Sequence, residues 1–155
     1  MYLSIHGRSL RKGRISCQGQ VYLVTTVTAN RQPLFGDFQI GRVVVHEIMR
    51  ADRHGLSETM AFVVMPDHVH WMFSPVGNIS LSSVVGGMKR HSARQANTTL
   101  HRQGYSVWQR GFHDRALRSE ESVLDTARYI IANPLRAGLV DHVGMYPLRD
   151  TVFVL

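Results

Sequence analysis

The chain has 155 residues, 44% of them hydrophobic, which suits one compact domain with a real core rather than two domains. Its 18 basic and 11 acidic side chains give a formal charge of +7 and an isoelectric point of about 10.3, so polyanions such as nucleic acids are the expected partners. No apolar run is long enough to cross a membrane. The single cysteine, Cys17, excludes an internal disulfide and favours the reducing cytoplasm.

The first 19 residues are predicted to form a basic arm and residues 20–155 a single domain. The arm lacks the uninterrupted apolar stretch of a signal peptide. It carries Arg8, Arg11, Lys12 and Arg14, which either contact phosphates or are simply solvated.

Strand and helix patterns alternate along the domain. Segment 20–28 is rich in β-branched residues and predicts a strand, and a loop follows it. Segment 38–54 has apolar residues at helical spacing, and Gly55 suits its C-terminal cap. Segments 58–65 and 68–73 predict two strands joined by a turn at Pro66-Asp67.

The second half begins with Ser80, a predicted N-cap for a second helix whose stripe is Leu81, Val84, Val85 and Met88. A strand-like stretch follows at about 107–117. A last helix is expected to begin after Ser119 and to end before Pro134. The order predicts an α+β, ferredoxin-like β-α-β-β-α-β antiparallel sheet, with helices on one face, the other face open, and an added C-terminal helix.

Two histidines interrupt the apolar segment "MPDHVHWMF", at His68 and His70. Because side chains alternate in a strand, Val69, Trp71 and Phe73 are expected to face the core, and the histidines with Met72 the open face. Neutral imidazoles two residues apart can chelate one divalent ion. Two ligands are too few for a structural zinc site, but they leave positions for phosphate oxygens and water. A strand that merely exposes two histidines is the alternative.

The last helix carries a tyrosine away from its apolar stripe. The stripe comprises Val123, Leu124, Ala127, Ile130 and Ile131. At about 100° per residue, Tyr129 lies roughly 160–200° from the middle of this stripe, with Asn133 one turn further on. Tyr129 is therefore either a surface tyrosine or a nucleophile with a polar ligand beside it.

Together, "MPDHVHWMF", "GGMKRHSARQ", "VWQRGFHDRALRSEES" and "ARYIIANPLRAGLV" resemble the single-tyrosine transposases of the HUH endonuclease superfamily, within it the REP-associated tyrosine transposases of bacteria. The resemblance covers about 21–140. It implies that His68, His70 and Asn133 bind Mg²⁺ or Mn²⁺ and that Tyr129 attacks single-stranded DNA to give a 5′-phosphotyrosine and a free 3′-OH. It also implies palindromic hairpin targets, a monomer or homodimer, and a location at the bacterial nucleoid.

Further basic residues are expected to contact DNA phosphates, with a solvated basic face as the alternative. Besides Arg11, Lys12 and Arg14, they are Lys89, Arg90, Arg94, Arg110 and Arg115. Trp108 is either a stacking platform or a core residue, and His113 either a polar group near the metal or a structural histidine.

Three other functions compete with a transposase. A host-domesticated DNA-binding protein of the same fold would lack the catalytic residues, which are present here. An RNA-binding module would show aromatics rather than histidines on the open face. A replication initiator or relaxase shares the chemistry, but the short chain and the single tyrosine favour a transposase.

Overall fold

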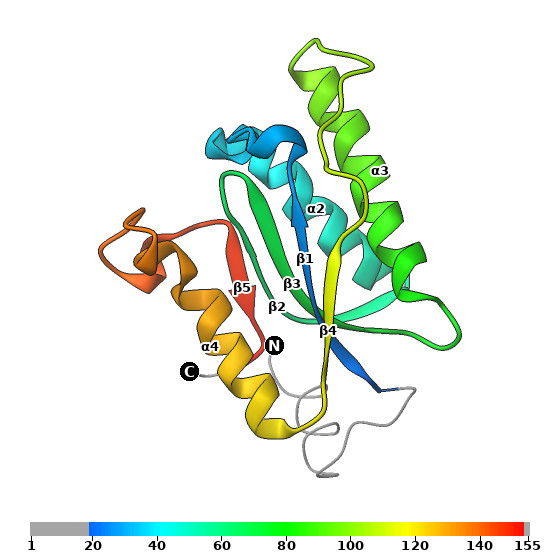
Figure 1. Ribbon diagram of the computed structural model, residues 1–155, viewed down its shortest axis with the longest axis vertical. Helices are drawn as coiled ribbons and strands as arrows, with labels where there is room; N and C mark the ends of the chain where they lie inside the picture. Colours follow the sequence, from blue (N-terminus) through cyan, green and yellow to red (C-terminus); the bar gives the residue numbers. More distant parts are fainter. Residues whose placement is uncertain (1–18, 154–155) are drawn as a thin grey trace.

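The computed structural model describes residues 19–153, so the basic residues predicted for the N-terminal arm lie outside the described residues. A five-stranded antiparallel sheet has the order β4-β1-β3-β2-β5 (Figure 1). The strands are β1 (Val21–Val27), β2 (Ser57–Val64), β3 (His68–Pro75), β4 (His113–Leu117) and β5 (Arg149–Thr151). The helices are α2 (Phe38–Arg53), α3 (Leu81–Thr99) and α4 (Glu120–Arg136), with short 3₁₀ turns at Ala29–Arg31, Leu34–Gly36 and Val143–Met145.

Local signals in the sequence explain where the helices begin. The Asp37 carboxylate accepts from the backbone N–H groups of Gln39 and Ile40 at the start of α2. Ser80 and Ser119 cap α3 and α4 in the same way through their hydroxyl groups. Gly55, just after α2, has a φ of 71°, which a glycine adopts without strain. Along the chain, the order of these strands and helices up to α4 is the predicted one.

Two boundaries and one additional strand differ from prediction. The strand expected at about 107–117 is only β4, preceded by an isolated bridge between Thr28 and Trp108. The last helix does not end before Pro134 but continues to Arg136. Pro134 removes only one hydrogen-bond donor close to the helix end, where the N–H groups of Ala137 and Gly138 still reach carbonyls of α4. The short polar edge strand β5 was not predicted.

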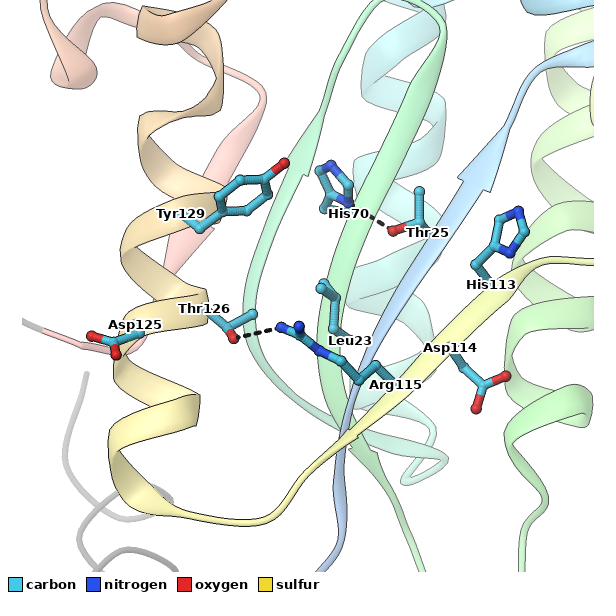
Figure 2. A pocket seen from close by; sticks show the side chains of 9 residues that line it. All are labelled: Leu23, Thr25, His70, His113, Asp114, Arg115, Asp125, Thr126 and Tyr129. Carbon is cyan, nitrogen blue, oxygen red and sulfur yellow. Dashed lines mark hydrogen bonds between the residues drawn. The ribbon is translucent and has the colours of Figure 1, made fainter.

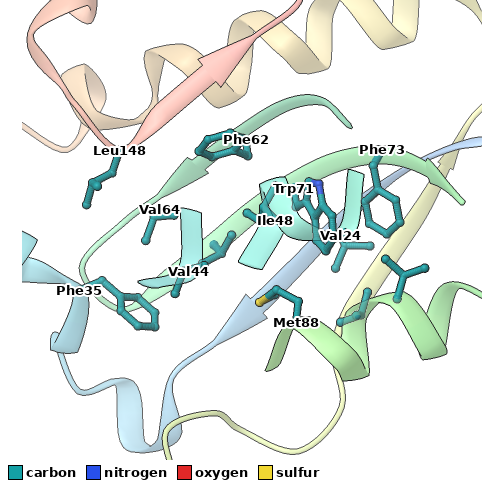
Figure 3. Packing of buried hydrophobic residues seen from close by; sticks show 14 of the residues in the cluster. Val24, Phe35, Val44, Ile48, Phe62, Val64, Trp71, Phe73, Met88 and Leu148 are labelled. Carbon is teal, nitrogen blue, oxygen red and sulfur yellow. The ribbon is translucent and has the colours of Figure 1, made fainter. Parts of the chain in front are cut away.

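The sheet has two apolar faces, each covered by different helices. On one face, β1, β2 and β3 contribute Val24, Phe62 and Trp71 to a core shared with α2 and α3 (Figure 3). Val69 and Phe73 belong to this core as well, and the rings of Trp71 and Phe73 stack 4.0 Å apart. The alternation predicted for β3 is thereby confirmed.

The opposite face is covered by α4 instead of being open. Met72, Val63 and Leu117 of the sheet pack there against Ala127 and Ile130 of α4. Figure 1 shows α4 beside β5, apart from α2 and α3. The prediction of an open face was wrong because the apolar stripe of α4 needs a surface to bury, and this sheet face supplies it. As a consequence, α4 brings its polar flank next to the two histidines.

Among residues 19–153, no helix combines the length and the apolar character needed to cross a membrane.

Candidate active site

Strand register aligns three polar residues in one row on the α4 side of the sheet. Thr25 of β1 lies opposite His70 of β3 and also opposite His113 of β4. Residues directly opposite each other in antiparallel strands point to the same face. The row His113–Thr25–His70 therefore lies on the α4 side of the sheet, and all three residues line one cavity with Tyr129 of that helix.

The two histidines of β3 lie side by side, with ring centroids 4.9 Å apart and nearly perpendicular planes. The Nδ1 atom of His68 is 2.7 Å from the Asp67 carboxylate oxygen Oδ1, and Nδ1 of His70 is 2.8 Å from the Thr25 hydroxyl. A carboxylate only accepts, so His68 donates from Nδ1 and carries its lone pair on Nε2. Such partners fix ring orientation in metal-binding histidines.

Asp67 is itself held in place. Its second carboxylate oxygen accepts from Arg31 at 3.0 Å. Burial would raise the pKa of Asp67, but the hydrogen bonds from His68 and Arg31 outweigh it and lower that pKa. Asp67 is thus a carboxylate at neutral pH that orients His68, in addition to forming the predicted turn.

His70 is 9% exposed, and its burial lowers its pKa to about 4, with the positive charges of His68 and Arg136 acting in the same direction. It is therefore neutral at physiological pH, as a metal ligand must be.

The donor set fits a divalent ion bound together with substrate. Both Nδ1 atoms are occupied, which leaves the two Nε2 atoms for a ligand. No group of three or more His, Cys, Asp or Glu side chains within residues 19–153 forms a closed site. A histidine pair alone leaves most positions of an octahedral ion to water, phosphate and neutral oxygen donors such as an amide.

Asn133, the third predicted ligand, is half-buried on α4, one turn after Tyr129. Among the described residues, those that line the cavity between α4 and the sheet include neither Asn133 nor His68. The assignment of Asn133 therefore stays a prediction.

Tyr129 reaches over His70 from α4 (Figure 2). It is 49% exposed although Ile130 beside it is fully buried, so it lies off the core face as predicted. Its ring centroid is 5.8 Å from that of His70 in an edge-on arrangement. Both residues line a cavity of about 440 Å³ between α4, β1, β3 and β4, and this space is large enough for part of a nucleotide chain.

Arg136 holds the tyrosine from the C-terminal turn of the same helix. Its guanidinium lies 4.1 Å above the Tyr129 ring, and Nη2 donates to the Tyr129 carbonyl at 2.9 Å. This double contact restrains the ring and places a cation beside the histidines.

The predicted DNA-contacting residues do not form one surface. Arg115 lines the cavity and its Nη2 lies 3.4 Å from the Thr126 hydroxyl of α4 (Figure 2). Lys89 instead donates to the carbonyls of Gln109 and Gly111. The others, Arg90, Arg94 and Arg110, are exposed.

Two predicted alternatives now have positions. His113 is exposed and lines the cavity of Tyr129, which places it beside the candidate site. Trp108 is half-buried, packs on Phe35 at 5.1 Å and donates to the Ser92 hydroxyl at 3.1 Å, which makes it at least partly a core residue.

Sequence reasoning missed three residues at the site: Thr25, Arg136 and the orienting role of Asp67. Asp67 had a usable signal, since an acidic residue directly before a histidine pair is a natural hydrogen-bond partner. Thr25 had none, because its place depends on the register between β1 and β3.

Comparison with known proteins places the chain in a family. The family model described as "Transposase IS200 like" matches residues 17–133. The REP-associated tyrosine transposase of Escherichia coli K12 is 27% identical over 137 residues, which cover 86% of this chain and 78% of that protein. The structure of a REP-associated tyrosine transposase bound to a REP hairpin superposes with a TM-score of 0.69 and 26% identity, over 85% of this chain and 76% of that one.

A candidate transposase from Deinococcus radiodurans R1 shares the fold, with a TM-score of 0.51 and 22% identity over 71% of this chain and 87% of that one. The family match spans most of the sheet, both histidines and the tyrosine helix up to Asn133. The chain therefore belongs to the IS200-like transposase family, similar within it to the REP-associated tyrosine transposases, and its enzyme class is that of the DNA transposases.

Proposed function

We propose that the protein is a metal-dependent endonuclease and strand transferase that nicks and rejoins single-stranded DNA at palindromic hairpin repeats. The observation that carries the proposal is the position of Tyr129, whose ring lies 5.8 Å from His70 in a cavity that Arg115 also lines. A candidate nucleophile, an oriented imidazole and an arginine therefore line one cavity, and the second imidazole, that of His68, lies 4.9 Å from His70.

The chemistry is a transesterification at phosphorus. The Tyr129 hydroxyl oxygen attacks the phosphorus and loses its proton, the bond to the 3′ oxygen breaks, and that oxygen leaves as a 3′-OH after gaining a proton. A 5′-phosphotyrosine results. In the reverse direction a 3′-OH attacks the phosphotyrosine and restores Tyr129, so no bond energy is lost to hydrolysis.

His68, His70 and Asn133 would hold the Mg²⁺ or Mn²⁺ ion. When bound, the ion would neutralise negative charge on the non-bridging phosphate oxygens and orient the phosphate. Asp67 and Thr25 contact the Nδ1 atoms of His68 and His70, which leaves both Nε2 atoms free to face the ion. Arg136 restrains the nucleophile, and Arg115 offers a charge-assisted hydrogen bond to a phosphate of the bound strand.

A hairpin is the proposed target because the relative with the TM-score of 0.69 was solved bound to a REP hairpin. The charge of +7 supports a nucleic-acid partner independently of that likeness.

The test is covalent capture. The protein is incubated with labelled single-stranded hairpin DNA, with and without Mn²⁺, and separated under denaturing conditions. We expect a Mn²⁺-dependent adduct that disappears in Tyr129→Phe and persists in Tyr105→Phe, which changes another exposed tyrosine. An adduct formed by the Tyr129→Phe protein would refute the assignment.

A further inference from the structure

The cavity between α4 and the sheet holds one chemically active side chain, His113, that the transesterification described above does not use. His113 is the first residue of β4, the edge strand of the sheet, and it is exposed. It lines the same space of about 440 Å³ as Tyr129 and His70. The same reaction leaves one step without a group to perform it, because the departing 3′ oxygen has to gain a proton.

Tyr129 and His113 approach His70 from opposite sides. In the sheet, β3 with His70 has β2 on one side and β1 on the other, and β4 lies beyond β1. The register places Thr25 between His113 and His70. Helix α4, which carries Tyr129, packs over β2 and β5 on the far side of β3. Figure 2 shows the resulting order, with Tyr129 on one side of His70 and Thr25 and His113 on the other.

This order suits displacement at phosphorus, in which the attacking and leaving oxygens lie roughly in line. Neighbouring strands are about 4.8 Å apart, so the main chain of His113 lies about 10 Å from that of His70. The gap between the two imidazoles is therefore wide enough for a phosphodiester. A phosphate attacked by Tyr129 from the β2 side releases its 3′ oxygen toward β1 and β4, where His113 lies.

Of the charged and titratable side chains that line this cavity, His113 is the one best suited to exchange a proton with that oxygen. Arg115 does not give up its proton in proteins, and the carboxylates of Asp114 and Asp125 accept but hold no proton to donate. Burial lowers the pKa of His70 to about 4, so His70 is neutral at physiological pH. An accessible imidazole can both donate and accept a proton near neutral pH.

We propose that His113 is the general acid that protonates the 3′ oxygen when Tyr129 cleaves the strand, and the general base that takes this proton back when a 3′-OH rejoins it. The assignment rests on the proposed function for the reaction itself. It adds a catalytic residue that contacts the leaving oxygen, on the side of the phosphate opposite to the nucleophile.

The atoms of the step balance in both directions. In cleavage, the Tyr129 hydroxyl gives its proton to water and its oxygen bonds to phosphorus; the bond from phosphorus to the 3′ oxygen breaks, and a proton passes from the His113 imidazolium to that oxygen. In rejoining, the 3′-OH gives its proton to the neutral imidazole, its oxygen bonds to phosphorus, and the Tyr129 oxygen leaves and takes a proton from water.

The variant that tests this role is His113→Gln. Glutamine keeps a hydrogen-bonding group at this position but cannot deliver a proton. Formation of the Tyr129 adduct should slow about 100-fold or more, as the loss of a general acid does. Hairpin affinity, measured in a Tyr129→Phe background, should stay within about threefold, because proton transfer occurs only in the reaction. The matched control is His46→Gln, at an exposed position of α2, which should change neither quantity.

A hairpin oligonucleotide with sulfur in place of the bridging 3′ oxygen separates proton donation from positioning. A thiolate leaves without being protonated, because a thiol is a much stronger acid than an alcohol. With this substrate and Mn²⁺, adduct formation by His113→Gln should stay within about fivefold of the wild-type rate. The product is the same 5′-phosphotyrosine, so this substrate also supplies the covalent complex of the variant.

That complex allows the reverse step to be measured. Covalent complexes of wild type and His113→Gln are mixed with a strand that ends in a 3′-OH. The variant should rejoin it more slowly by a factor similar to that for cleavage, since one group serves as acid and base in the two directions. Rejoining at the wild-type rate would overturn the proposal.

The remaining outcomes decide between His113 and the reaction as a whole. Equal slowing of His113→Gln on the oxygen and sulfur substrates would make His113 a positioning residue and overturn the proposal. A wild-type rate on the oxygen substrate, or a loss of hairpin affinity of more than about tenfold, would also overturn it. Each of these results leaves the wild-type adduct intact and refutes the role of His113 alone. Absence of an adduct in the wild type on either substrate refutes the proposed cleavage chemistry and the role of His113 with it.

Discussion

Replacing Asp67 by asparagine tests whether this carboxylate sets the metal-facing nitrogen of His68. Asparagine keeps the size of the side chain but removes its charge, and its amide group can donate as well as accept. The imidazole then no longer has to donate from Nδ1 to Oδ1 across 2.7 Å, and the tautomer with a free Nε2 loses its main support.

The structure sets the size of the expected effect. The side chains of His68 and Asp67 are 20% and 28% exposed, so their contact is worth more than the 0–1 kcal/mol of a typical surface pair. Loss of such an orienting partner typically weakens metal binding about 10- to 100-fold, which corresponds to about 1.4–2.7 kcal/mol.

The assay is a titration of Mn²⁺ into DNA-free protein near neutral pH, with free Mn²⁺ followed by electron paramagnetic resonance. Arg31→Gln is the matched control because it removes the other partner of Asp67, a contact whose arginine is 63% exposed. We expect the control to weaken binding less than about fivefold. Wild-type affinity in Asp67→Asn would refute the orienting role of the carboxylate.

Three further predictions concern His70 and helix α4. The folded-state pKa of His70 is about 4, below the unfolded value of 6.5, so the unfolded state binds more protons between these two pH values. The free energy of unfolding should therefore fall by about 3 kcal/mol as the pH drops from 6.5 to 4. Urea unfolding of the wild type and of His70→Asn measures this difference, and equal pH slopes for the two proteins would contradict it. Arg136→Gln should slow adduct formation about tenfold while hairpin affinity stays within about threefold. Arg128→Gln, on the same helix, should change neither quantity. If Arg136→Gln forms the adduct as fast as the wild type, Arg136 does not act at the site. Ile130→Ala should cost about 2–5 kcal/mol of unfolding free energy, because this side chain of α4 is fully buried against the sheet, and a loss below 1 kcal/mol would show that the helix is not docked as described.

Alternation and capping made most of the sheet and the first two helices predictable. The split of β3 into core-facing Trp71 and site-facing His70 follows from strand geometry alone, and α3 begins at the serine that the sequence suggested. Alternation and capping depend only on residues a few positions apart, so they can be recognised in a single sequence.

The remaining features depend on contacts between distant segments. The docking of α4 on the second sheet face and the pairing of β5 with β2 are set by which apolar surfaces are left to bury. The hydrogen bond between Thr25 and His70 requires the register of two strands 45 positions apart. Helix α4 also continues through Pro134, although this residue cannot donate a helical hydrogen bond, and the stripe of α4 that packs on the sheet ends only at Ile131. Residue type and spacing were enough to single out the histidines and the tyrosine as candidates, whereas the place of Thr25 beside His70 depends on a distant pairing.

The polarity of the covalent link tests the proposed chemistry most directly. Hairpin DNA is labelled at its 3′ end in one sample and at its 5′ end in another, and each is incubated with the protein and Mn²⁺. A 5′-phosphotyrosine keeps the fragment on the 3′ side of the nick attached, so only the 3′ label should migrate with the protein, and mass spectrometry should place it on Tyr129. Retention of the 5′ label, or attachment to another residue, would contradict the account.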